Sequence, residues 1–304
     1  MSAGVAQTAR WRAEAFAWDC LQAGLGGLSL DAASAMGGAI MSWLGPFLPW
    51  RHVALRNLAL AFPDHTTAER RAVVAKMWDN LGRLAGEFPH TPRLDPYAPD
   101  SRVTVEGRAH LDAVRESGRG AVFASGHFAN WEVMAAAITR AGVTCHVTYR
   151  AANNPLIDQR IIDQRQAYGV RLQSPKGRRG GRQLMSALAR GESIALMVDQ
   201  KYTTGVETPF FGRPAMTNPA AVKLALHYGA PLIPMSARRL RGARFLVTVH
   251  PPLEIGAAKD EASVLDGARR LTQFIEAEIR AAPEQWLWIH RRFDKSVYTG
   301  RVDD

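Results

Sequence analysis

The feature that most constrains this chain is a regular alternation of short apolar runs and longer helix-like runs across residues 102–282. Most of the short runs are continuously apolar, which is typical of strands in a sheet that is covered on both faces. The pattern predicts an α/β fold with a central, mainly parallel or mixed sheet flanked by helices. The strand-like runs are 102–107, 120–125, 143–149, 170–174, 193–199, 230–237 and 245–253, and the helix-like runs are 109–117, 130–142, 155–169, 182–191, 218–229 and 262–282.

The first 50 residues differ from the rest because they contain a long uncharged stretch. Residues 32–50 carry no charged side chain, but Asp31 precedes them and glycines and a proline interrupt them. A spanning helix needs roughly 20 apolar residues in series. The stretch therefore predicts either one membrane span or a helical hairpin inserted in one leaflet, and a buried pair of core helices is the alternative.

Four tryptophans within residues 1–50 favour the membrane, because indole side chains suit the headgroup level. The apolar region is too long and too far into the chain for a cleaved signal peptide. With 304 residues, 47% of them hydrophobic, the chain can bury a sizeable core. We therefore expect a membrane-associating helical segment at 1–50 and an α/β domain at 51–304.

Residues 66–88 have the apolar spacing of an amphipathic helix. Thr66 and Glu69 stand at the spacing of a capping box, which predicts where this helix begins. The proline-rich stretch at 89–100 then connects it to the alternating region.

The charge balance points to an anionic partner. The net charge is +10 and the isoelectric point is near 10.1, which suits a phosphorylated lipid, a membrane surface, an acidic protein or nucleic acid. A solvated basic surface would give the same numbers. Because no aromatic-rich RNA-binding motif accompanies the charge, we expect no nucleic-acid partner. The two cysteines, Cys20 and Cys145, are too few for a disulfide framework and indicate a reducing compartment.

The stretch SGHFANWE, residues 125–132, joins a strand-like run to a helix-like run. His127 follows the strand, and ligands of α/β sheets gather at the carboxyl ends of strands. Asn130 is a candidate N-cap, which places Glu132 in the first helical turn. A carboxylate that turns back to one ring nitrogen would fix the imidazole tautomer and raise the basicity of the other nitrogen. The pattern predicts a His127–Glu132 pair that takes a proton from a hydroxyl, and a structural histidine is the alternative.

Other catalytic arrangements have less support in the sequence. It contains no His-Glu-x-x-His and no paired Cys-x-x-Cys, so we expect no bound metal. It also contains no Gly-x-Ser-x-Gly elbow for a serine nucleophile and no phosphate-loop signature. A histidine base without an enzyme nucleophile implies direct attack by the hydroxyl of the substrate.

SGHFANWE resembles the His-x4-Asp/Glu motif of the glycerolipid and lysophospholipid acyltransferase superfamily. Four further stretches, at 56–74, 149–161, 196–225 and 283–293, resemble the lipid A biosynthesis lauroyl/myristoyl acyltransferases. The similarity runs from about residue 56 to residue 293. The first motif alone is weak, whereas the five stretches in this order are specific.

The resemblance implies a reaction and its partners. It implies transfer of an acyl chain from an acyl thioester, carried by acyl carrier protein or coenzyme A, to a hydroxyl of a lipid A precursor at the inner face of the cytoplasmic membrane. The partners would be acyl carrier protein, an anionic phosphorylated glycolipid and the membrane, and no further cofactor is implied.

The resemblance also implies roles for individual residues. His127 would be the general base and Glu132 its orienting carboxylate. The family often has a proline where this chain has Ala151, so the backbone path there departs from the family pattern. Further functional positions of the family match Arg165 and Asp199, and its substrate-side block matches Arg150 and Asn154.

Three alternatives stay open at this point. The acceptor of the same chemistry could be another glycolipid, an ornithine lipid or a phospholipid. A metal-dependent lipid hydrolase would require bound metal. A basic membrane-surface binding protein without enzymatic activity would not need His127.

Overall fold

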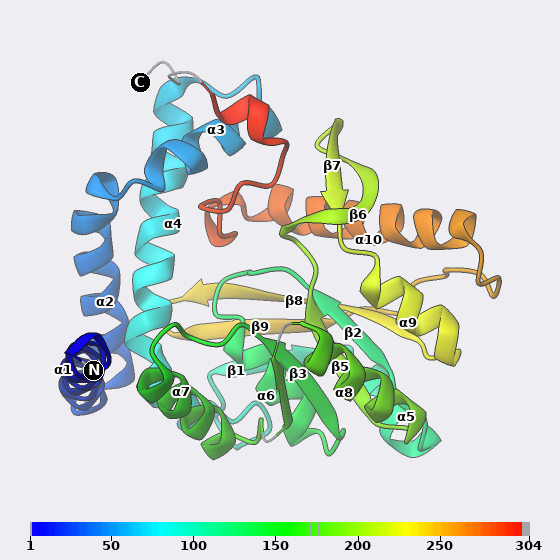
Figure 1. Ribbon diagram of the computed structural model, residues 1–304, viewed down its shortest axis with the longest axis horizontal. Coiled ribbons are helices and arrows are strands. Elements are labelled where there is room, and N and C mark those ends of the chain that lie inside the picture. Colours follow the sequence, from blue (N-terminus) through cyan, green and yellow to red (C-terminus); the bar gives the residue numbers. More distant parts are fainter. Residues whose placement is uncertain (1, 171, 176, 300–304) are drawn as a thin grey trace.

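The computed structural model describes residues 2–299 except 171 and 176, and it contains a central seven-stranded sheet (Figure 1). The strand order is β1-β9-β8-β2-β5-β3-β4, and neighbouring strands are parallel except β8 and β9. Each strand overlaps one of the predicted runs, so the expected α/β fold with a mixed, mainly parallel sheet is confirmed. The strands are β1 (Val103–Glu106), β2 (Val122–Ser125), β3 (Cys145–Tyr149), β4 (Leu172–Pro175), β5 (Ser193–Met197), β8 (Leu232–Arg241) and β9 (Arg244–Val249).

Helices cover both faces of this sheet. One face packs against α5 (Arg108–Ser117) and α6 (Glu132–Arg140), and the other packs against α8 (Arg178–Ala189), α9 (Ala220–Tyr228) and α10 (Glu261–Ala281). Along β2 the side chains alternate between the two cores. Val122 and Ala124 join the core that includes α8, α9 and α10, whereas Phe123 joins the core that includes α5 and α6. Because both sides of β2 are buried, its sequence is continuously apolar.

The long helix α4 (Thr67–Glu87) stands at one side of the sheet (Figure 1). Thr66 and Glu69 form the predicted capping box at its start. Helix α2 (Leu30–Leu44) runs along α4 at very short range. A Cβ placed on Gly37 would lie 2.2 Å from the carbonyl oxygen of Gly82, and one placed on Gly82 would lie 2.1 Å from that of Gly37. Only glycine at both positions allows this separation of the two helices.

The remaining N-terminal elements are α1 (Ser2–Gly26), the short η1 (Gly45–Phe47) and α3 (Arg51–Ala61). Within the described part of the chain, no helix combines the length and the apolar character needed to cross a membrane. The predicted boundary at residue 50 falls between η1 and α3. The face of α2 away from α4 exposes large apolar side chains, namely Met36, Ile40, Trp43 and Leu44, and Phe47 of η1 continues them.

Two features of the fold lie outside the alternating pattern. Strands β6 (Lys201–Phe210) and β7 (Arg213–Thr217) form a separate antiparallel hairpin near α10, and the sequence predicted no strand there. The C-terminal residues 283–299 return across the carboxyl ends of the central strands, where Trp286 forms a β-bridge with Phe128. This return brings the C-terminal segment next to His127.

Candidate active site

His127 lies just beyond the end of β2, and Asp199 lies just beyond the end of β5. The two strands are parallel neighbours, so their carboxyl ends meet. His127 Nδ1 lies 2.8 Å from Asp199 Oδ1, and the backbone N–H of His127 donates to Asp199 Oδ2 at 2.8 Å. Trp286 Nε1 donates to the same Oδ2 at 2.8 Å. The carboxylate of Asp199 therefore fixes both the ring and the backbone of His127.

The electrostatics of this pair decide which ring nitrogen can accept a proton. Burial would raise the pKa of the Asp199 carboxyl, but the charge of His127 and the hydrogen bonds from His127 and Trp286 outweigh it and hold that pKa below its usual range. Asp199 is therefore ionised at neutral pH. Nδ1 of His127 carries a proton and donates a hydrogen bond to this carboxylate. Within the described residues Nε2 has no hydrogen-bond partner, and 17% of the His127 side chain is exposed. In the neutral ring Nε2 is thus the free acceptor.

Glu132 does not contact His127, which corrects the predicted pair. Its carboxylate accepts two hydrogen bonds from Arg165, at 2.6 and 3.0 Å, and one from the hydroxyl of Tyr168. Asp199 takes the orienting position that was expected for Glu132. The reason is that α6 begins at Glu132, and this start directs its carboxylate toward Arg165 and Tyr168 instead of back toward His127.

The start of α6 also differs from the expectation. Trp131 is the N-cap residue and Glu132 is the first helical residue. The side chain of Asn130 still supports this end, because its Oδ1 accepts from the backbone N–H of Glu132 at 3.2 Å.

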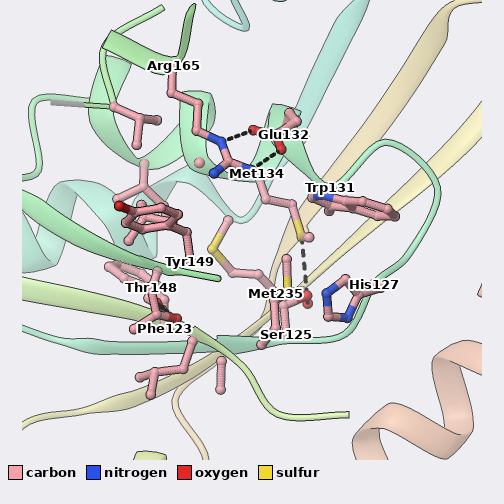
Figure 2. A pocket seen from close by; sticks show the side chains of 18 of the residues that line it. Phe123, Ser125, His127, Trp131, Glu132, Met134, Thr148, Tyr149, Arg165 and Met235 are labelled. Atoms are coloured by element: carbon pink, nitrogen blue, oxygen red, sulfur yellow. Dashed lines mark hydrogen bonds and ion pairs between the residues drawn. The ribbon is translucent and has the colours of Figure 1, made fainter. Parts of the chain in front are cut away.

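The Glu132–Arg165 pair is held in its charged form. Burial would raise the pKa of Glu132, but the charge and hydrogen bonds of Arg165 outweigh it and lower that pKa. Burial would likewise lower the pKa of Arg165, and Glu132 instead raises it. Burial and the charge of Glu132 raise the pKa of Tyr168 well above its usual value. Arg165 lies on α7 (Pro155–Ala167), so the pair links α6 to α7 (Figure 2).

One cavity connects these groups. It has a volume of about 280 Å³, and His127, Glu132 and Arg165 line it together with apolar side chains (Figure 2). Arg150 also lines this cavity. The site therefore combines a histidine acceptor, an ion pair and an apolar space. The apolar lining includes Phe123, Met134, Ile138, Val170, Leu196 and Met235.

Asn154 does not reach this cavity. It caps α7 by accepting from the backbone N–H of Leu156 at 2.9 Å, and it donates to Trp11 O and Glu14 Oε2 at 3.0 Å each. Its role on the substrate side therefore stays a prediction. Its side-chain amide makes its hydrogen bonds in the cap of α7 and in the contact between α1 and α7.

The sequence did not single out Tyr168 or Trp286. Tyr168 is three residues beyond Arg165, the spacing at which side chains share a helix face, and that spacing was the available signal. Trp286 belongs to the stretch at 283–293, whose similarity to the family was its only signal. No group of three His, Cys, Asp or Glu side chains among the described residues is arranged to hold a metal ion.

Comparison with known proteins supplies the family. The sequence model of the bacterial lipid A biosynthesis acyltransferases matches residues 12–295. The chain belongs to this family. It is therefore an acyltransferase, and the alternative of a binding protein without activity is set aside.

The acyltransferase is similar to several characterised relatives. It is 32% identical over 270 residues to the lipid A biosynthesis palmitoleoyltransferase of Escherichia coli (strain K12), covering 85% of this chain and 83% of that one. It is 30% identical over 250 residues to the lipid A biosynthesis lauroyltransferase of the same strain, covering 78% and 77%. It is 31% identical over 237 residues to the phosphatidylinositol mannoside acyltransferase of Mycobacterium tuberculosis (strain CDC 1551 / Oshkosh), covering 76% and 73%.

Among solved structures, the 1-acyl-sn-glycerophosphate (LPA) acyltransferase of Thermotoga maritima is 12% identical. The match covers 83% of this chain and 95% of that chain with a TM-score of 0.40.

Proposed function

We propose that this acyltransferase moves a fatty acyl chain from an acyl thioester to a hydroxyl of a lipid A precursor. The observation that carries the proposal is the His127–Asp199 pair, whose free nitrogen lies beside a cavity with an apolar lining. An apolar cavity suits an acyl chain, and a neutral imidazole suits the deprotonation of a hydroxyl. We favour acyl carrier protein as the thioester carrier, because an acidic carrier complements a chain of net charge +10.

In the proposed mechanism the acceptor hydroxyl gives its proton to His127 Nε2 while its oxygen attacks the thioester carbonyl. Asp199 stabilises the imidazolium that forms. The tetrahedral intermediate then collapses, the carbon–sulfur bond breaks, and the thiolate leaves with the proton that His127 returns. The ester product and the free thiol account for every atom, and no acyl-enzyme forms.

Glu132 and Arg165 have a different part in this proposal from the one first expected. Their ion pair lines the cavity at the start of α6. In this proposal Arg165 fixes the carboxylate of Glu132 at the start of α6, the helix that follows the His127 loop. Arg150 lines the same cavity and its side chain is exposed, which suits a phosphate of the acceptor or of the carrier.

The acceptor class is the finer part of the proposal. The family model that matches is that of the lipid A acyltransferases, but the phosphatidylinositol mannoside acyltransferase is 31% identical, between the 32% and 30% of the two lipid A acyltransferases above. A second candidate acceptor is therefore another glycolipid. Mass spectrometry of lipids from cells with and without this protein tests the choice. One additional acyl chain on lipid A supports the proposal, and an additional chain only on another lipid overturns the acceptor.

The proposed location is the cytoplasmic side of the inner membrane, where the lipid acceptor would be reached. The exposed apolar side chains of α2 and η1 support attachment to a lipid surface. In this arrangement α2 lies in the plane of the interface, with its inner face on α4.

A further inference from the structure

The loop that carries His127, residues 126–131, has a strained backbone. Ala129 has φ of +44°, in the left-handed region that residues other than glycine seldom adopt. Such a conformation persists only where the surroundings determine it. The contacts that support this loop therefore determine where the His127 ring lies.

Besides the β-bridge described above, hydrogen bonds join the loop to three residues of distant segments. Asp199 accepts from the backbone N–H and faces the ring of His127. The backbone N–H of Ala129 donates to the carbonyl of Gln285 at 2.7 Å. The third contact is from Asn130, whose Nδ2 donates to Glu87 Oε2 at 2.9 Å. Asn130 and Glu87 are each completely buried.

Glu87 is the last residue of α4 and the centre of a buried polar cluster. Besides Asn130 it accepts from Ser34 Oγ of α2 at 2.6 Å, and it forms a two-pronged ion pair with Arg239. Arg239 lies near the end of β8, which points toward α4 (Figure 1). Its side chain also donates to Asn80 Oδ1 at 3.0 Å.

Arg239 also holds Gln285, the second residue to which the loop is hydrogen-bonded. Its backbone N–H and carbonyl form two hydrogen bonds with the Gln285 side chain, at 2.7 and 3.0 Å. The carbonyl of Gln285 in turn accepts from Ala129. The Glu87–Arg239 pair therefore supports two of these three hydrogen-bonded contacts, those of Asn130 and of Gln285.

We propose that Glu87 is a positioning residue of the reaction, which fixes the His127 loop through Asn130 and Arg239. This rests on the proposed function only in that His127 is the base. Glu87 touches no reacting group: it belongs neither to the cavity lining nor to the partners of His127. Its carboxylate fixes the conformation of loop 126–131, and that conformation fixes the position of the His127 ring.

The test compares Glu87→Gln and Asn130→Ser with the control Ser34→Ala. Glu87→Gln keeps the size of the side chain and removes the charge that Arg239 pairs with. Asn130→Ser leaves Glu87 and Arg239 intact and replaces the amide donor to Glu87 with a shorter hydroxyl, which can still accept from the backbone N–H of Glu132 at the start of α6. Ser34→Ala removes a hydrogen bond to the other oxygen of the same carboxylate, Oε1. Each variant is assayed well below its melting temperature.

For Glu87→Gln and Asn130→Ser we expect kcat to fall by about 10- to 100-fold with KM nearly unchanged, because a misplaced base slows chemistry without weakening binding. Hydrogen–deuterium exchange of the peptide 126–131 should accelerate. Ser34→Ala should keep kcat and the exchange of this peptide, although its melting temperature falls. The double variant Glu87→Gln/Asn130→Ser should lose less than the product of the two single losses, since both break one link.

A folded Glu87→Gln protein with unchanged exchange in 126–131 overturns the proposal, and so does an unchanged kcat. If Glu87→Gln does not fold, Asn130→Ser decides by the same two measurements. If the wild-type protein acylates none of the acceptors offered, the proposed function fails instead. The exchange experiment needs no substrate, so it then decides the role of Glu87 by itself.

Discussion

At the scale of single residues, the His127 ring depends on a carboxylate that another strand contributes. We predict that Asp199→Asn lowers kcat on the order of 10²–10⁴-fold, because an uncharged amide neither fixes the tautomer nor stabilises the imidazolium. A second histidine–carboxylate pair offers a matched control: His146 Nε2 lies 2.9 Å from Glu192 Oε2, outside the cavity lining. Steady-state kinetics should show normal turnover for Glu192→Gln. Normal turnover of Asp199→Asn would contradict the role of the pair.

The ion pair of Arg165 with Glu132 makes a second prediction. Arg165→Lys should lose at least about 10-fold in kcat, because lysine offers a point charge and cannot supply both hydrogen bonds to Glu132. Arg160 is the control, since it pairs with Asp19 at an exposed site on the same helix. Turnover of Arg160→Lys should stay within about 2-fold, as expected for an exposed ion pair. Equal turnover of the two variants would mean that Arg165 has no part in the catalytic site.

The two buried carboxyls also predict an acid sensitivity. The folded pKa values of Asp199 and Glu132 lie below their usual values, so the unfolded chain binds more protons than the folded chain as pH falls. Their stabilising contribution is complete above the usual carboxyl pKa of roughly 4 and is lost progressively below it. Thermal melting from pH 7 to about pH 2 should show this loss. The Asp199→Asn protein should have a shallower acid dependence, and an identical dependence would contradict the assignment.

His127 was predictable because it stands at the carboxyl end of an apolar run and within a recognisable motif. Its partner was not predictable from the local sequence. Asp199 is 72 residues away, and their contact depends on β2 and β5 being neighbours. Glu132 was placed beside His127 because the two are close along the chain. A helix that starts at Glu132 instead directs its carboxylate to α7, a direction that periodicity cannot supply.

At the scale of elements, the contact between α2 and α4 depends on glycine. We predict that Gly82→Ala destabilises the protein by about 1–3 kcal/mol, since the added carbon would meet the backbone oxygen of Gly37 and backbone cannot move aside easily. Gly181 of α8 is the control, because a Cβ there meets nothing within 4 Å. Gly181→Ala should stabilise by about 0.5–1 kcal/mol through the higher helix propensity of alanine. Chemical denaturation measures both, and destabilisation of equal size in both would contradict the packing argument.

The central strands and α4 were predictable because burial on both faces and a capping box leave local signals. The hairpin β6–β7 was missed, because its strands belong to no buried sheet and their outer residues are exposed. The packing of α2 was missed for another reason. Its glycines read as interruptions of an apolar run, whereas they are the residues that let α2 approach α4. A glycine weakens an isolated helix and permits a close contact, and only the partner helix distinguishes the two effects.

At the scale of the whole molecule, most of the exposed large apolar side chains among the described residues lie in the first 50 residues, on α1, α2, η1 and the residues beside them. Helix α2 packs on α4 at the edge of the molecule, and its other face exposes large apolar side chains (Figure 1). Trp43 is 71% exposed and Phe47 is 78% exposed. Large apolar side chains exposed together mark an interaction surface, and a net charge of +10 adds attraction to anionic lipid.

We therefore predict that Trp43→Ser/Phe47→Ser weakens binding to vesicles of anionic phospholipid at least about 10-fold, because each aromatic side chain contributes roughly 1.5–3 kcal/mol when buried. The melting temperature should hardly change, since neither side chain is in the core. The control Tyr202→Ser removes an aromatic side chain that is 45% exposed on β6, and it should bind like wild type.

Vesicle co-sedimentation at low and high salt separates the apolar contribution to binding from the electrostatic one. Salt weakens the electrostatic attraction of all three proteins, because exposed charges are screened over about 8–10 Å. The apolar difference between the double variant and wild type should persist at high salt. Equal binding of the double variant and wild type at high salt would mean that another face of the protein meets the membrane.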